Sequence, residues 1–171
     1  AVALVIEWVK KNNRLPTSSD FGSAENKINL TYYKFSGTGA YKDGGAQEKN
    51  RIFASPFEAW VAVAHEAQKQ GIPFRWLDLK WNNEIIPELR SYWQKEAVEE
   101  VIYWIKINKK MPTGTEFRIT EGKINLHNGK FFGTGNYKDG EIREKNRIFS
   151  SPLEAWNAIA AEAKRQGIPF R

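Results

Sequence analysis

The sequence predicts a mainly α-helical protein that consists of two tandem helix-turn-helix-like modules. Shifting the chain by 96 positions aligns residues 1–75 with residues 97–171 without a gap, and 45 of the 75 aligned positions are identical. Each copy begins and ends with a segment whose apolar residues recur at helical spacing. We therefore expect module 1 over residues 1–75, a helical linker over 76–96 and module 2 over 97–171.

The first helix of each copy is predicted from its aliphatic residues, which form one face at helical spacing. These residues are Val2, Val5, Ile6 and Val9 in copy one and Val98, Val101, Ile102 and Ile105 in copy two. The helix should end before Pro16 or Pro112, because the residue that precedes a proline is pushed out of helical geometry. Pro87 is placed as the first residue of a helix that runs from the linker into copy two.

The last helix of each copy has clear start and stop signals. In copy two, Ser151-Pro152-Leu153-Glu154 combines a serine N-cap, a proline at the first helical position and a glutamate at the third. Gly167 supplies the C-terminal stop, and copy one repeats the whole pattern. We expect a core-facing stripe made of Trp60, Ala64 and Ala67 in copy one and of Trp156, Ala160 and Ala163 in copy two.

Two shorter elements are expected between these helices. In copy one, Thr17 caps a short helix that runs to Phe21, and a third short helix begins at Asn29 and ends at Gly37. The equivalent bounds in copy two are Thr113, Phe117, Asn125 and Gly133. Residues 127–130, His-Asn-Gly-Lys, also suit a hairpin turn, and a small hairpin in each module would make the fold α+β. Helix is favoured because Tyr32-Tyr33 in copy one does not suit a tight primed turn.

The residue content excludes several classes of site. The chain has no cysteine, which excludes disulfides, thiolate metal sites and cysteine nucleophiles, and which favours an intracellular location, cytoplasmic or nucleoid-associated. His65 and His127 stand where the other copy has Ala161 and Thr31, so neither belongs to a shared metal or acid–base site. We therefore expect a protein that is not an enzyme and that uses no cofactor or metal.

The start of the chain gives no sign of a membrane partner. The longest apolar stretch, residues 1–6, is far shorter than the roughly 20 residues of a membrane span, and no basic segment precedes it as in a signal peptide. The chain lacks an initiator Met and begins and ends at equivalent points of the repeat. We therefore expect it to be part of a longer chain.

Positive charge is concentrated in one region of each copy. The chain has 26 Lys and Arg against 20 Asp and Glu, and residues 27–51 and 123–147 each carry a net charge of +3. The same regions hold the polar stretches that the copies share most closely, since residues 34–44 match at 9 of 11 positions and 48–53 at all. Exposed connections normally diverge fastest. The close match of these polar stretches between the copies therefore indicates a ligand common to both; a recent duplication is the alternative explanation.

The basic regions contain the residues that we expect to contact nucleic acid. A helix in the major groove reads bases with short polar side chains, and Lys or Arg position it on phosphates. The contacts expected in the third helix and just before it are Lys27, Asn29, Thr31, Tyr32 and Lys34 in module 1 and Lys123, Asn125, His127, Asn128 and Lys130 in module 2. The loop that follows adds Lys42, Lys49 and Arg51 in module 1 and Lys138, Lys145 and Arg147 in module 2. N-capping is the alternative role of Asn29 and Asn125.

Three features of copy one follow one another along the chain. They are the motif Arg14-Leu15-Pro16-Thr17-x-x-Asp20-Phe21, a short polar helix that ends near Phe35, and Ala59-Trp60 leading to Gly71-Ile72. This order resembles the helix-turn-helix repeats that accompany homing endonucleases. The resemblance implies that the short third helix reads DNA. The sequence departs from that pattern by inserting residues 36–54 between the third helix and the tryptophan.

The leading prediction is therefore sequence-specific, non-catalytic binding of double-stranded DNA by two tandem modules. Their head-to-tail order predicts a non-palindromic site with two related segments about one helical turn apart. The first alternative is binding of RNA or single-stranded nucleic acid, with Tyr32, Tyr33, Tyr41 and Tyr137 as stacking platforms. The second is a protein–protein interaction repeat.

Overall fold

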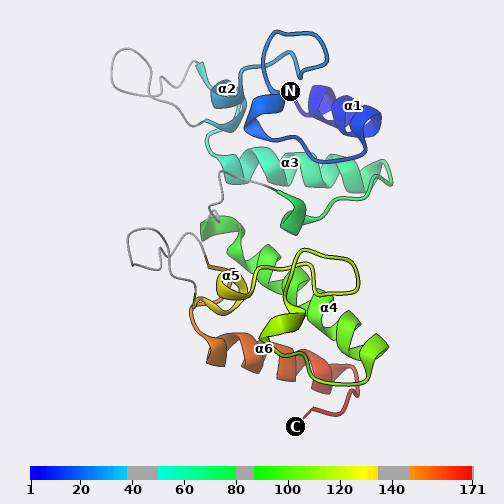
Figure 1. Cartoon of the computed structure of the whole chain (residues 1–171). Coiled ribbons are helices and arrows are strands. Elements are labelled where there is room, and N and C mark those ends of the chain that lie inside the picture. Colours follow the sequence, from blue (N-terminus) through cyan, green and yellow to red (C-terminus); the bar gives the residue numbers. More distant parts are fainter. Residues whose placement is uncertain (38–49, 80–86, 135–146, 171) are drawn as a thin grey trace. The chain divides into compact units, whose positions relative to one another are not determined.

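The chain forms two compact units, residues 1–82 and 83–171 (Figure 1). The computed structural model describes residues 1–37, 50–79, 87–134 and 147–170. Within these ranges there are six α-helices and no strand, so the prediction of a mainly α-helical protein is confirmed. No helix in the described part of the chain is long and apolar enough to cross a membrane.

Both units share the order long helix, 3-10 turn (η), short helix and long helix; a further 3-10 turn follows this order in unit 1 and precedes it in unit 2. Unit 1 contains α1 (Val2–Asn12), η1 (Ser18–Asp20), α2 (Tyr32–Ser36), α3 (Pro56–Lys69) and η3 (Trp76–Asp78). Unit 2 contains η4 (Pro87–Leu89), α4 (Arg90–Asn108), η5 (Gly114–Glu116), α5 (Asn128–Phe132) and α6 (Pro152–Arg165). Helix α4 runs without a break from the segment before module 2 into that module, as predicted, but it begins at Arg90 rather than at Pro87, because Pro87–Leu89 form the 3-10 turn η4.

The core of each unit lies between its first and last long helices. Helix α1 packs against α3, and α4 packs against α6 (Figure 1). The predicted aliphatic face of α4 is confirmed, because each of its four side chains is at most 7% exposed. These residues are Val98, Val101, Ile102 and Ile105. In α1, Val5, Ile6 and Val9 are buried in the same way, and Val2 is half-buried.

The signals that start and stop the last helix act as predicted, with one difference. The Ser151 hydroxyl accepts a hydrogen bond from the backbone N–H of Glu154 at 3.2 Å. The Glu154 carboxylate accepts from the N–H of Ser150 at 2.8 Å, whereas the predicted box would pair it with the N–H of Ser151. Gly167 then ends the helix in the left-handed region at φ +67°. Glu58 and Gly71 repeat both features in unit 1.

The core-facing stripe of the last helix is placed differently from the prediction. In α6 the buried residues are Ala155, Ile159 and Ala163, whereas Trp156 and Ala160 are half-buried. The buried face is therefore centred one residue earlier than predicted. In α3, Trp60 is 1% exposed, because its ring packs edge-on against Phe35 with centroids 5.6 Å apart.

The third helix starts later than predicted. We expected it to begin at Asn29, but α2 begins at Tyr32 with Thr31 as its N-cap, and the Thr31 side chain makes no capping hydrogen bond. The reason is that the N–H of Ile28 donates to the Asp20 carbonyl at 2.8 Å and the N–H of Leu30 donates to the Ile28 carbonyl at 2.6 Å. Both N–H groups therefore bond outside the helical pattern, in which each would donate to the carbonyl four residues earlier, and the backbone here forms a turn instead of a helix.

The third helix of unit 2 shows the same shift. Helix α5 begins at Asn128 with His127 as its N-cap, not at Asn125 as predicted. Residues 128–132 are helical, so the alternative of a hairpin is not found there. The predicted end of the third helix is confirmed in both units, because Gly37 and Gly133 cap it in the left-handed region.

Candidate nucleic-acid interface

The candidate interface of each unit follows a capped 3-10 turn. The hydroxyl and the backbone N–H of Thr17 both donate to the Asp20 carboxylate, at 2.8 and 2.7 Å. Arg14 forms a two-point ion pair with the same carboxylate, at 2.9 and 2.8 Å, and its hydrogen bond lowers the pKa of Asp20 to about 2. Unit 2 repeats this turn with Thr113, Glu116 and Lys110. The turn therefore has the same anchored start in both units.

A tryptophan of the first helix fixes the loop that leads to the candidate interface. The indole N–H of Trp8 donates to the backbone carbonyl of Asn26 at 3.1 Å, and that of Trp104 donates to the carbonyl of Gly122 at 3.2 Å. Asn26 and Gly122 both have left-handed backbone, with φ of 64° and 75°. Each accepting residue directly precedes a lysine of the predicted site. The core tryptophan therefore positions the beginning of the interface.

The five residues after this anchor alternate between buried and exposed positions. In unit 1, Ile28 is 2% exposed and Leu30 is half-buried, whereas the three residues around them are exposed. In unit 2, Ile124 and Leu126 are buried, and their neighbours are again exposed. We call the exposed residues the outward row. It consists of Lys27, Asn29 and Thr31 in unit 1 and of Lys123, Asn125 and His127 in unit 2.

The first residue of the short helix does not belong to the exposed surface. Tyr32 is 9% exposed, and its ring packs edge-on against Phe21 with centroids 5.0 Å apart. Burial raises the pKa of its hydroxyl above the usual range. Its counterpart Asn128 is half-buried. The amide nitrogen of Asn128 lies against Gly114, so that a Cβ added to Gly114 would be only 2.8 Å from it. The exposed aromatic side chain of α2 is that of Tyr33, at 58%.

The structure brings together two cationic positions that are far apart in the sequence. The backbone N–H of Ile52 donates to the carbonyl of Lys34 at 2.8 Å, which places Arg51 next to the short helix. Ile148 makes the same bond to the carbonyl of Lys130, also at 2.8 Å. Lys34 is exposed and Arg51 half-buried.

The same pair of positions is more enclosed in unit 2. Lys130 and Arg147 are both half-buried there. Burial lowers the pKa of Lys130. Of the other predicted phosphate contacts, four lie outside the described residues: Lys42, Lys49, Lys138 and Lys145. Two of the proposed stacking residues, Tyr41 and Tyr137, lie outside them as well.

No acidic side chain in the described part of the chain neutralises the lysines of the outward row or Lys34 beside it. Over the described ranges, Lys27, Lys123 and Lys34 form no ion pair, whereas Lys10 pairs with Glu7 and Arg165 with Glu162. Unit 2 has a further exposed cation, Arg118. Its backbone N–H donates to the Ile124 carbonyl at 3.1 Å, which places it beside the outward row. Sequence reasoning missed Arg118, since unit 1 has Gly22 at this position and the copies share no signal there.

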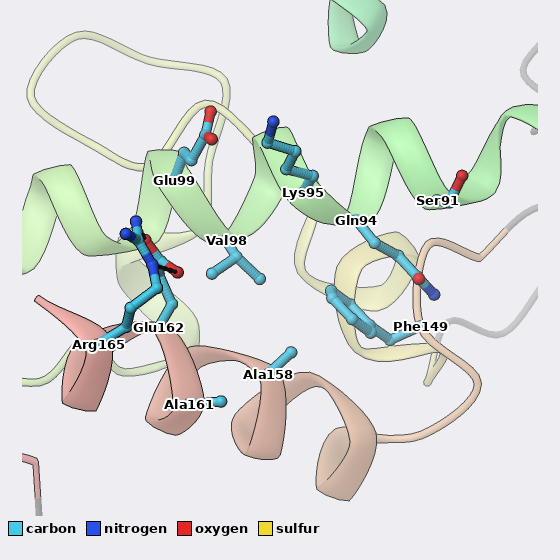
Figure 2. A pocket seen from close by; sticks show the side chains of 10 residues that line it. All are labelled: Ser91, Gln94, Lys95, Val98, Glu99, Phe149, Ala158, Ala161, Glu162 and Arg165. Carbon is cyan, nitrogen blue, oxygen red and sulfur yellow. Dashed lines mark hydrogen bonds and ion pairs between the residues drawn. The ribbon is translucent and has the colours of Figure 1, made fainter.

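A groove of about 640 Å³ lies elsewhere in unit 2, between α4 and α6 (Figure 2). Val98 and Ala158 line it, Arg165 and Glu162 form an ion pair at one end, and the Gln94 amide donates to the Ile148 carbonyl at 2.9 Å. None of the predicted nucleic-acid contacts that the structure describes lines this groove. Across the residues that the structure describes, no group of three or more His, Asp or Glu side chains could hold a metal ion.

Comparison of the chain with protein-family models, with curated proteins and with solved structures finds no match.

Proposed function

We propose that this protein binds double-stranded DNA through its two modules and catalyses no reaction on it. The outward row is the observation that carries the proposal. Two copies that differ at 30 of 75 positions keep a lysine and an asparagine at the same exposed places, on the same buried anchors. Exposed polar residues normally drift unless they contact something. A lysine beside an amide suits a phosphate contact beside a base edge.

The cations around the row supply the affinity in this proposal. Lys27, Lys34 and Arg51 in unit 1 neutralise phosphates and release the counterions condensed on DNA. Lys123 and Arg147 do the same in unit 2. With four or five such contacts, the association constant should fall on the order of 10²-fold between 50 and 200 mM salt.

Fluorescence anisotropy with a labelled duplex, a single strand and an RNA of the same sequence, each over a salt series, tests the proposal. The double variant Lys27→Ala/Lys123→Ala should weaken binding to all duplexes alike and lower the salt slope by about 2. The matched control is Lys69→Ala/Lys164→Ala, which removes two exposed lysines from the last turns of α3 and α6. Duplex binding that is absent, or that barely weakens with salt, would reject the proposal.

One observation favours single-stranded nucleic acid as the second candidate ligand. The ring of Tyr33 is 58% exposed and could stack on a base, which is worth about 1–3 kcal/mol. Unit 2 has Gly129 at this position, so stacking there would involve unit 1 alone. Tyr33→Ala should then weaken binding of the single strand and leave duplex binding unchanged. If the single strand binds more tightly than the duplex, this candidate replaces the first.

A further inference from the structure

Asn29 and Asn125 occupy the apex of a tight turn. The N–H of Leu30 donates to the Ile28 carbonyl at 2.6 Å, and the N–H of Leu126 donates to the Ile124 carbonyl at 2.7 Å. A hydrogen bond between residues two apart closes a three-residue γ-turn, and both asparagines have negative φ, which makes it the inverse form. The central residue of such a turn projects away from the bond that closes it.

Buried neighbours hold this turn in place. Ile28 is 2% exposed and Ile124 is fully buried, and both form a parallel bridge with a core phenylalanine. The N–H of Ile28 donates to the Asp20 carbonyl at 2.8 Å, and its carbonyl also accepts from the N–H of Gly22 at 3.0 Å. The backbone under each asparagine is therefore fixed before any ligand binds.

No structural role accounts for the two asparagine side chains. Asn29 does not cap α2, since the N-cap is Thr31, and Asn125 does not cap α5, since the N-cap is His127. Their amides make no hydrogen bond to any residue that the structure describes, and both are exposed. An amide carries a donor and an acceptor side by side, which matches N7 and N6 on the major-groove edge of adenine.

We propose that Asn29 and Asn125 each read one adenine from the major groove, and that Thr31 or His127 beside them sets the preference at a neighbouring base pair. This inference rests on the proposed DNA binding and assigns the reading to the γ-turn rather than to the short helix. Position 32/128 at the start of that helix is unsuited to reading, because Tyr32 lies in the core and Asn128 packs over Gly114. The two half-sites should therefore share an adenine and differ next to it.

Selection of binding sites from a random duplex library tests this assignment. Asn29→Ala should remove the adenine preference from one half-site only, and Asn125→Ala from the other, each with a loss of about 5- to 150-fold on the selected site. Thr31→His should shift the neighbouring preference of its half-site toward that of the other, and His127→Thr should do the reverse. Binding to unrelated duplexes should stay unchanged, because Lys27 and Lys123 remain.

A modified base makes the test specific to the proposed contact. Replacing the adenine of the Asn29 half-site by 7-deazaadenine removes its N7 acceptor. The replacement should weaken DNA binding by the unaltered protein but leave binding by the Asn29→Ala variant unaffected. Circular dichroism of each variant checks that the helices are intact. Equal losses on every sequence would assign the asparagines to the phosphate backbone and overturn the inference. Unchanged preferences would overturn it too and leave the proposed DNA binding standing. Absence of duplex binding by the unaltered protein would reject both.

Discussion

Tyr32 packs edge-on against Phe21, with ring centroids 5.0 Å apart and ring planes inclined by 70°. In unit 2 the ring that meets the equivalent Phe117, at 5.0 Å and 64°, belongs to Phe132. Phe132 aligns with Ser36, four residues after Tyr32, and residues four apart lie on the same helical face. The aromatic ring has therefore moved by one helical turn between the copies, and the same core space is filled in both.

This exchange predicts a compensating pair of substitutions in unit 1. Tyr32→Asn should lower the free energy of unfolding by about 3 kcal/mol or more, because it removes a buried ring and leaves an amide in apolar surroundings. Adding Ser36→Phe to the same chain should recover a large part of the loss, since it reproduces the arrangement of unit 2. Urea unfolding of both variants, with hydrogen exchange over residues 21–36, measures this. A double variant no more stable than Tyr32→Asn alone would show that the two cores are not interchangeable.

The anchor between Trp104 and Gly122 predicts a local loss of order. Trp104→Phe keeps an aromatic ring in the core but removes the indole N–H that donates to the Gly122 carbonyl at 3.2 Å. We expect a loss of about 1 kcal/mol in stability. Amide exchange should rise near Lys123 and stay unchanged in α6. Trp8→Phe is the matched variant, and it should loosen the loop at Asn26 in the same way.

The ion pair of Arg14 and Asp20 predicts a dependence of stability on pH. Asp20 has a pKa of about 2 in the folded chain against 3.8 ordinarily, so the unfolded chain binds more protons between these values. The contribution is thus complete above about pH 5 and is lost as the pH falls through 4 toward 2. We expect it to be about 1–2 kcal/mol, because Arg14 is half exposed and solvent screens the pair.

Asp20→Asn isolates this contribution from that of other carboxylates. The difference in unfolding free energy between the unaltered chain and the variant should shrink from pH 6 to pH 2. Glu116 and Glu162 also have pKa values of about 2, but they titrate equally in both chains and cancel in the difference. A difference that stays constant over this range would contradict the assignment to Asp20.

Two glycines with the same backbone angle but different surroundings give a matched comparison. Gly133 and Gly167 have φ of 68° and 67°. A Cβ at Gly133 would lie 2.5 Å from the Phe149 carbonyl oxygen, whereas a Cβ at Gly167 would meet nothing within 4 Å. Gly167→Ala should cost about 1 kcal/mol for the left-handed backbone alone. Gly133→Ala should cost about 3 kcal/mol or more, because the carbonyl must also move. Thermal unfolding of the two variants compares these costs, and equal shifts would contradict the close contact.

Several elements could be predicted from the sequence because their causes are local. Ser151 and Pro152 start α6, and Gly167 stops it, through groups that act within one helical turn. The repeat provides a second kind of information, because the basic segments are nearly identical in two copies that are offset by 96 residues. One relationship does not follow from the alignment. The ring that packs edge-on against the conserved phenylalanine comes from Tyr32 in unit 1 but from Phe132, which aligns with Ser36, in unit 2.

The sequence by itself predicted the tandem repeat, the mainly α-helical class of fold and the residues that start and stop the last helix of each copy. Tertiary structure decided where the short helix begins, that Tyr32 turns inward while Asn29 stays outside, and that Lys34 and Arg51 become neighbours. The physical reason is that caps and stops depend on backbone groups a few residues apart. Burial and the pairing of distant segments depend instead on which surfaces meet, and here Asp20, Trp8 and Ile52 supply partners that no local pattern contains.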